Sequence, residues 1–312
     1  MKKNTVEISI IIPVYNEEEN IQILYEEIRN SLDKLKKPYE IIFIDDGSSD
    51  TTFECLKNIK NREKKEKHTQ AHTRIIRFAR NFGQTAAMQA GFDFAKGEII
   101  VSLDGDLQND PNDIPTFLNK LDEGYDVVCG WRKDRKDKTL TRIIPSKIAN
   151  WLIAKITGVQ IHDNGCSLKA YRSSVIKSFN LYSDMHRFIP AMSTLTGAKI
   201  AEIVVNHRPR KYGTTKYGLS RTWRVLFDMI IIKMLIHFND RALLWFTILS
   251  LPVLICGLIF GALSIALFYA GQYNIIFPAA SFLFLSAFGI LFLSGTFAEF
   301  VTTIESAQEK IQ

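Results

Sequence analysis

The sequence lacks a glycine-rich phosphate-binding loop of either common type. No GxGxxG run follows a strand, and no GxxxxGK run is followed by Ser or Thr. Both kinds of loop hold phosphates through backbone N–H groups at the start of a helix. A nucleotide diphosphate bound by this chain therefore needs another partner, and we expect a divalent cation.

Cysteine is scarce, and its spacing matches no metal-binding or disulfide framework. The four cysteines are scattered without a CxxC pair, which excludes a zinc ribbon and fits a reducing cytosol: Cys55, Cys129, Cys166 and Cys256. His68 and His72 are four residues apart, but they lie within a run of charged residues. That setting indicates a solvated helix end and loop rather than a metal site.

Charge is absent from residues 242–298, which contain no Asp, Glu, Lys or Arg. This length suits two membrane spans of about 20 residues each, and the GQYN sequence at 271–274 separates them into 243–269 and 275–298. A buried helical pair of a soluble protein is the alternative. The amino-terminal apolar run is short and ends in acids, so we do not expect a signal peptide.

Lys and Arg are plentiful before the first expected span and absent from the short turn between the two spans. The positive-inside rule therefore predicts a large domain and a tail, residues 299–312, in the cytoplasm. The expected location is the inner membrane, crossed more than once.

Three acidic signatures each follow a short apolar run: PVYNEEEN, DDGSSD and DGDLQ. Such runs are typical of buried parallel strands, and open α/β sheets bind ligands beyond the carboxyl ends of their strands. In an extended segment residues i and i+2 face the same side, so Asp104 and Asp106 can approach one cation together. Their oxygen ligands suit Mg²⁺ or Mn²⁺.

The alternation of apolar and helical patterns predicts an α/β fold with a mostly parallel sheet. Strands are expected at 7–13, 39–45, 73–78, 98–104 and 125–130, and helices at 17–35, 50–66, 84–95 and 112–122. Two later segments, 132–155 and 207–241, each carry eight Lys or Arg against two acids. Their aromatic and aliphatic content favours helices that lie in the lipid headgroup region, although soluble helices are an alternative.

The chain resembles the family 2 glycosyltransferases of the GT-A fold, and within them the polyprenyl-phosphate group. That group includes dolichyl-phosphate mannose synthases and bacterial bactoprenol glucosyltransferases. The resemblance covers nearly the whole chain and is carried, in the order the family uses, by PVYNEEENI, IDDGSSDTT, RNFGQTAAMQAGFDFAKGEIIVSLDGDLQNDP, VVCGWR, DNGCSLKAYR and RPRKYGTTKY.

The resemblance implies a cytosolic GT-A domain at 1–215, with an interface helix near 143–157. A juxtamembrane amphipathic helix at 216–241, two transmembrane helices within 242–298 and a cytosolic tail follow. The implied reaction is the inverting transfer of a hexose to undecaprenyl phosphate, with glucose from UDP-glucose favoured. A donor such as GDP-mannose or an amino sugar is the alternative. A catalytically silent scaffold for glycan assembly is an alternative from another class, whereas a processive synthase is disfavoured because the QxxRW motif is missing.

The expected site has four overlapping sets of residues. The metal ligands are Asp104, Asp106 and Gln108. The nucleotide-sugar residues are Pro13, Tyr15, Asn16, Glu17, Asp45, Asp46, Gln84 and Asp104. The acceptor-phosphate residues are Arg132, Arg142, Ser146, Arg208, Arg210 and Lys216, and the catalytic residues are Asp104, Asp106, Asp163 and Arg132.

Asp163 aligns with a position where relatives that act on hydroxyl acceptors place a base. Here it either orients the acceptor or the sugar hydroxyls, or forms a turn without any chemistry. The chain departs from the family pattern at Asn164-Gly165-Cys166, where relatives usually have Ser-Gly-Phe, which leaves the details of the pocket open. The expected partners are a nucleotide sugar, a polyprenyl phosphate, the membrane, further copies of this chain, a flippase and a downstream glycosyltransferase, and no nucleic acid.

Overall fold

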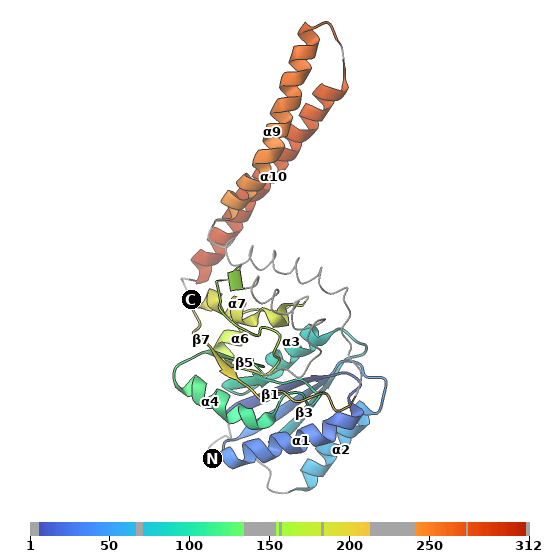
Figure 1. Ribbon diagram of the computed structural model, residues 1–312, viewed down its shortest axis with the longest axis vertical. Helices are drawn as coiled ribbons and strands as arrows, with labels where there is room; N and C mark the ends of the chain where they lie inside the picture. The colour runs from blue at the N-terminus through green and yellow to red at the C-terminus, as the bar shows by residue number, and fades with distance from the viewer. Residues whose placement is uncertain are drawn as a thin grey trace. The chain divides into compact units, whose positions relative to one another are not determined.

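The computed structural model describes residues 6–66, 71–133, 154–155, 158–181, 184–212, 241–272 and 274–309 (Figure 1). The chain divides into two compact units, Met1–Ile232 and Lys233–Gln312. Most of the expected interface helix near 143–157, and all of the expected juxtamembrane helix at 216–241 except its last residue, lie outside the described residues. The finer division into four segments therefore stays a prediction.

The first unit is built on a sheet of seven described strands in the order β3-β2-β1-β4-β6-β5-β7. The first four run parallel to one another: β1 (Ile8–Val14), β2 (Tyr39–Asp45), β3 (Ala71–Arg77) and β4 (Ile99–Ser102). Strand β6 (Lys169–Arg172) is antiparallel to both β4 and β5 (Val127–Trp131), and β7 (Ile200–Val204) pairs in parallel with β5. The predicted α/β class with a mostly parallel sheet is confirmed.

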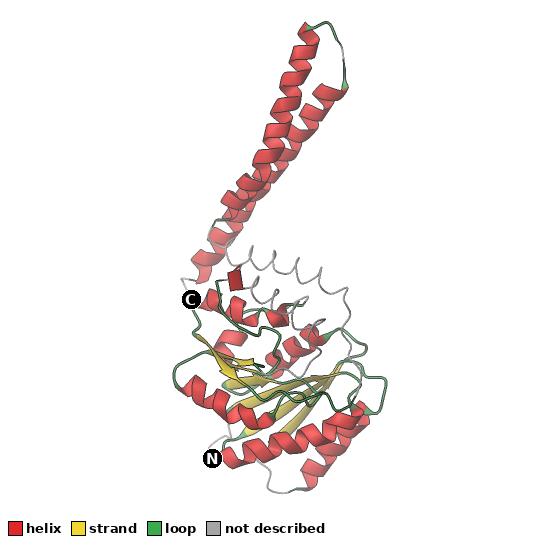
Figure 2. Cartoon of the chain, viewed as in Figure 1, coloured by secondary structure: helices red, strands yellow, loops and turns green. Residues whose placement is uncertain are grey.

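Helices cover both faces of this sheet (Figures 1 and 2). Three of them lie on one face: α1 (Glu18–Leu32), which continues into η1 (Asp33–Leu35), α2 (Thr52–Lys65) and α4 (Ile114–Asp122), which follows η2 (Pro111–Asp113). Helix α3 (Gln84–Phe94) packs on the opposite face against β1 and β2. Short turns of helix complete the unit: α6 (Ser173–Ile176), η4 (Met185–Arg187), α7 (Ile189–Ser193) and η5 (Thr194–Thr196).

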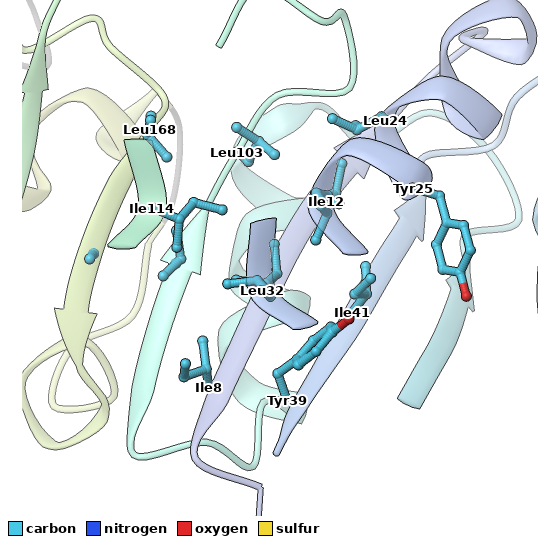
Figure 3. Close-up of a cluster of buried hydrophobic side chains, with 14 of the residues drawn as sticks. Ile8, Ile12, Leu24, Tyr25, Leu32, Tyr39, Ile41, Leu103, Ile114 and Leu168 are labelled. Atoms are coloured by element: carbon cyan, nitrogen blue, oxygen red, sulfur yellow. The ribbon is translucent and has the colours of Figure 1, made fainter. Parts of the chain in front are cut away.

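The core between β1 and α1 follows from the two-residue alternation of side chains along the strand and the 3.6-residue repeat of the helix. Ile8, Ile10 and Ile12 are alternate residues of β1 and face one side, and all three are fully or almost fully buried. Leu24 and Leu32 of α1 belong to the same buried cluster and lie over Ile8 and Ile12 (Figure 3). Each such side chain contributes roughly 1.5–3 kcal/mol by leaving water. The core thus fixes the strand ends that carry the acidic loops.

The second unit contains α9 (Ala242–Tyr269) and α10 (Ile276–Glu309). Within them Ala242–Tyr269 and Ile276–Ile304 are long and apolar enough to cross a membrane. The helices approach each other at a small residue, because a Cβ on Gly257 would lie 2.9 Å from Leu285 Cδ2. The Leu243 N–H donates to Glu299 Oε2 at 2.9 Å, so a carboxylate caps the start of α9.

Candidate active site

The first two acidic loops are tied together by hydrogen bonds between their backbones and side chains. Asn16, which adopts a positive φ of 53°, directs its N–H to Ser48 Oγ at 2.9 Å, and its Oδ1 accepts the Ser49 N–H at 2.8 Å. The next N–H, of Glu17, donates to Thr52 Oγ1 at 2.8 Å. The parallel pairing of β1 with β2 places both loops at the carboxyl edge of the sheet, as the sequence predicts.

Asp45 is the last residue of β2 and Asp46 follows it, and the two carboxylates have different hydrogen-bond partners. Asp45 is fully buried, and its Oδ1 accepts the Ser48 N–H at 2.9 Å. Its Oδ2 has no hydrogen-bond partner among the described residues and lies 3.3 Å from Arg77 Nε. Arg77 in turn lines a pocket of about 360 Å³ together with Gly47 and Ser48. An unsatisfied buried acceptor beside a pocket is suited to receive the N–H of a ligand.

Asp46 has a local structural function. Its carboxylate accepts the N–H groups of Phe82 and Gly83 at 2.7 and 2.9 Å, just before α3 begins. Burial raises its pKa, while these two hydrogen bonds act in the opposite direction. Asp46 therefore fixes the loop that places Gln84 at the site.

The third acidic loop brings Asp104 and Asp106 together at the end of β4. Asp104 Oδ1 accepts from Gln84 Nε2 at 2.8 Å. Burial, followed by the charge of Asp106, raises the pKa of Asp104 to about 6. Asp106 is buried, and its Oδ1 accepts the Gln108 N–H at 3.1 Å. A cation between the two carboxylates would offset the repulsion between them and the cost of burying their negative charge.

A guanidinium approaches the same carboxylate. Arg210 Nη2 lies 2.7 Å from Asp106 Oδ2 and 3.5 Å from Gln108 Oε1. Within the described segments no group of three or more His, Cys, Asp or Glu side chains gathers as a metal site. Two carboxylates and an amide oxygen form a set of hard oxygen ligands that fits Mg²⁺ or Mn²⁺. The positively charged Arg210 guanidinium beside Asp106 is consistent with a site that attracts cations. The ligand assignment stays a prediction.

Arg132 and Asp163 form a largely enclosed ion pair with two parallel hydrogen bonds. Arg132 Nε and Nη2 donate to Asp163 Oδ2 and Oδ1 at 2.7 and 3.0 Å. Burial opposes the positive charge of Arg132, but the hydrogen bonds and charge of Asp163 outweigh it and raise the Arg132 pKa. The charges of Arg132 and Asp104 also interact, which places the pair beside the acidic loops.

The other expected acceptor residues fall into two groups. Arg208 is held by Glu27 on α1, with contacts of 2.9 and 2.8 Å, and by Asp110 at 2.8 Å. Arg142, Ser146 and Lys216 lie outside the described residues. Their assignment, like that of the nucleotide-sugar residues, stays a prediction. Pro13 belongs to β1, half-buried Tyr15 follows that strand, and Glu17 Oε2 accepts from Asn20 Nδ2 at 2.6 Å.

Two residues near this site are absent from the expected set. Lys169 in β6 is buried, and its Nζ donates to the carbonyls of Asn164, at 3.2 Å, and Cys166. Glu202 in β7 contacts the loop that carries Asp163. Neither position stands out in the sequence, because each depends on the pairing of β6 or β7 with β5.

The fold and these loops define a nucleotide-sugar transferase scaffold, and sequence comparison identifies the family. The family model described as "Glycosyl transferase family 2" matches residues 9–179. The chain therefore belongs to glycosyl transferase family 2, as its motifs predict.

Two relatives carry names that specify a lipid acceptor. "Dodecaprenyl-phosphate galacturonate synthase" of Rhizobium johnstonii is 43% identical over 240 residues, which cover 76% of this chain and 69% of that protein. "Undecaprenyl-phosphate 4-deoxy-4-formamido-L-arabinose transferase" of Edwardsiella ictaluri is 38% identical over 223 residues, covering 72% of this chain and 66% of that protein. About a third of each relative thus lies outside the matched region.

Solved structures confirm the GT-A fold. Glucosyl-3-phosphoglycerate synthase from Mycobacterium tuberculosis, in complex with Mn²⁺ and UDP-glucose, superposes with a TM-score of 0.55 at 18% identity, covering 73% of this chain and 79% of that one. TarS from S. aureus, in complex with UDP-GlcNAc, gives a TM-score of 0.50 at 16% identity, covering 73% and 67%. At these identities the likeness concerns the fold alone.

Proposed function

We propose that the chain transfers a sugar from a nucleotide diphosphate to the phosphate of a polyprenyl lipid at the cytoplasmic face of a membrane. The observation that carries the proposal is the convergence of three acidic loops and the Arg132–Asp163 pair at one edge of the sheet. The same chain contributes two helices long and apolar enough to span a membrane. The names of the two relatives support a polyprenyl phosphate as acceptor.

Within the donor half of the site, one group of residues would bind the base of the nucleotide and another would bind its diphosphate. The Oδ2 of Asp45 has no hydrogen-bond partner among the described residues and is suited to accept an N–H of the base, while Arg77, which forms an ion pair with it, is suited to donate to a base carbonyl. Asp104, Asp106 and Gln108 would hold a divalent cation. When bound, that cation supplies Lewis-acid stabilisation of the negative charge that grows on the leaving phosphate.

The acceptor half of the site needs positive charge more than it needs a base. The second pKa of a phosphate monoester is about 6, so the attacking oxygen is already an anion at cytosolic pH. Arg132 uses Nε and Nη2 on Asp163, and among the described residues nothing accepts a hydrogen bond from its Nη1. We assign these remaining N–H groups to the acceptor phosphate, which guanidinium donors match well.

Asp163 acts through Arg132 in this mechanism. Both of its oxygens accept hydrogen bonds from Arg132, and Oδ2 also receives the Arg132 N–H at 3.3 Å. A carboxylate engaged in this way is poorly placed to take a proton from a substrate. Of the two roles left open by the sequence, orientation of the acceptor through Arg132 is therefore the one we propose.

The transferred sugar is proposed only as a class. Family resemblance favours glucose from UDP-glucose, whereas the two relatives are named for galacturonate and 4-deoxy-4-formamido-L-arabinose. We propose a UDP-linked sugar, with glucose as one member of the class. The expected flippase, downstream glycosyltransferase and further copies of the chain remain predictions.

The test is a panel of labelled donors incubated with the full chain, Mn²⁺ and undecaprenyl phosphate. It includes UDP-glucose, UDP-galacturonate, a UDP-linked 4-formamido pentose and GDP-mannose. We expect one UDP sugar to label the lipid fraction and GDP-mannose to fail. Labelling from GDP-mannose alone would overturn the choice of base, and no labelled lipid with any donor would favour the silent scaffold.

A further inference from the structure

Glu202 holds the loop that orients Arg132. Its carboxylate accepts three N–H groups of two consecutive residues: the backbone N–H of Asp163 at 3.0 Å, the backbone N–H of His162 at 3.2 Å and the ring Nδ1 of His162 at 2.7 Å. Because a carboxylate only accepts, Nδ1 carries the proton of the imidazole in this arrangement. One side chain thus satisfies both backbone donors that precede the Asp163 carboxylate.

The strands around Glu202 give this contact a fixed geometry. In the parallel pairing of β5 with β7, Glu202 lies opposite Cys129, and Val204 lies opposite Trp131, the residue just before Arg132. The His162 ring stacks on the Trp131 ring with centroids 4.2 Å apart and planes inclined by 15°. The 162–163 loop is therefore bound to the end of β5 by a ring contact and to β7 by a carboxylate.

The chain of contacts ends at the guanidinium. Asp163 takes two hydrogen bonds from the Arg132 side chain and one from its backbone, and the two side chains are only 4% and 15% exposed. Buried partners of this kind have little freedom, so a shift of the loop moves the Arg132 fork. We infer that Glu202 is a positioning residue that sets the orientation of Arg132 towards the acceptor phosphate.

The expected effect of Glu202 on acceptor binding rests on the proposed function, whereas the contacts that link Glu202 to Arg132 do not. If Arg132 receives the lipid phosphate, loosening Glu202 weakens acceptor binding and leaves donor binding unchanged. Glu202→Gln keeps the size of the side chain but turns one acceptor oxygen into a donor facing N–H groups. We expect the KM for undecaprenyl phosphate to rise roughly tenfold, the effect of losing a hydrogen bond to a charged group. The nucleotide-sugar Kd should change less than about twofold.

Glu63→Gln is the matched control. Glu63 on α2 is buried, and its two carboxylate oxygens accept the Thr73 N–H of β3 at 3.0 Å each, at the opposite edge of the sheet. Like Glu202, whose side chain is 11% exposed, it is a largely enclosed carboxylate that accepts a backbone N–H, but no contact among the described residues links it to Arg132. Its substitution should lower the Tm by a similar amount while the lipid KM stays within about twofold.

A double-mutant cycle separates positioning from a general structural effect. If Glu202 acts through Arg132, Glu202→Gln should not raise the lipid KM further in an Arg132→Ala background. An equal loss in both backgrounds, or a lipid KM for Glu202→Gln no higher than that for Glu63→Gln, would overturn the inference. Asp163→Asn provides a second background should Arg132→Ala fail to fold.

Hydrogen–deuterium exchange gives a readout that does not depend on activity. Glu202→Gln should speed exchange of the His162, Asp163 and Arg132 amides, and Glu63→Gln should leave them unchanged. Unchanged exchange at Arg132 would refute the coupling even in an active enzyme. If the wild-type protein transferred no sugar to the lipid but faster exchange were seen, the proposed function would fall and the coupling would stand.

Discussion

Asp104 is a site carboxylate whose surroundings shift its pKa towards neutral pH. Its pKa is raised to about 6 by burial and then by the charge of Asp106. A cation competes with that proton, so we expect the affinity for Mn²⁺ to rise up to about tenfold per pH unit between about pH 5 and 6, and to level off above about pH 7. Titrating the lipid-free protein with Mn²⁺ measures this. A pH-independent affinity would contradict the assignment of Asp104 as a ligand.

Asp106 should matter for both chemistry and folding. The DGDLQ motif suggests an exposed loop carboxylate, but Asp106 is buried and paired with Arg210 at 2.7 Å. We expect Asp106→Asn to lower transfer at least about 1000-fold, because several kcal/mol of transition-state stabilisation is lost, and also to lower the Tm.

Asp110→Asn is the control for Asp106→Asn, since Asp110 is equally buried and paired with Arg208 at 2.8 Å. It should lower the Tm comparably and reduce transfer less than about tenfold. Similar losses of transfer in the two variants would indicate that Asp106 is only structural.

Variants of Arg132 distinguish most clearly between binding of the acceptor phosphate by a cationic side chain and catalysis by a general base. Arg132→Ala should raise the lipid KM or lower transition-state stabilisation, while hydrolysis of the nucleotide sugar is less affected. Arg132→Lys should rescue only partly, because an ammonium cannot keep the two-pronged contact with Asp163. The pH–rate profile should fall on the acid side near the phosphate pKa of about 6. Loss of that acid limb in Asp163→Asn would instead make Asp163 a general base.

At the level of elements, the turn after β2 depends on a glycine. Gly47 has a φ of +69°, and a Cβ there would lie 2.5 Å from the backbone carbon of Arg80. Gly47→Ala must therefore displace one wall of the pocket beside Asp45. We expect the nucleotide-sugar Kd to rise more than about tenfold and the Tm to fall, as calorimetry on the purified protein can measure.

Gly124→Ala is the control for Gly47→Ala, because it introduces the same kind of backbone strain without a steric clash. Gly124 has a φ of +95°, but nothing lies within 4 Å of its added Cβ. This variant should cost roughly 1–2 kcal/mol of stability from the left-handed conformation and leave the nucleotide-sugar Kd unchanged. Equal effects of the two variants on Kd would mean that the close approach to Arg80 has no part in donor binding.

The sequence predicts the first five strands well because they are buried apolar runs. The bounds of β2 match the prediction, and β1, β3, β4 and β5 differ by at most two residues at either end. Strands β6 and β7 were not predicted. β6 has only four residues and begins and ends with cations, Lys169 and Arg172, which give no strand pattern. Burial of Lys169 depends on its neighbours in the sheet.

The site was predictable to the same extent. Asp45, Asp104 and Asp106 are identified by their place directly after strands, since parallel strands end at one edge. The Arg210–Asp106 and Arg132–Asp163 pairs join residues 104 and 31 positions apart, and no local pattern specifies them. Glu202 belongs to the same class, because its position follows from the pairing of β7 with β5.

For the whole molecule, we expect a hairpin topology with both termini in the cytoplasm. Two apolar helices, Ala242–Tyr269 and Ile276–Ile304, follow a cation-rich segment. In a cysteine-free background, Gln272→Cys should react with a membrane-impermeant thiol reagent from outside, and Gln308→Cys only after permeabilisation. Reaction at both positions from outside would mean a single span and would contradict the topology.

Transfer of a sugar to a lipid phosphate is the central claim, and mass spectrometry of the lipid product tests it most directly. The full chain, with Mn²⁺, its preferred UDP sugar and undecaprenyl phosphate, should yield a lipid whose mass has increased by one sugar residue. That product should be a phosphodiester, in which the phosphate of the acceptor bridges the lipid and the anomeric carbon. An unmodified lipid, with free sugar or a sugar on a hydroxyl acceptor as the product, would contradict the account.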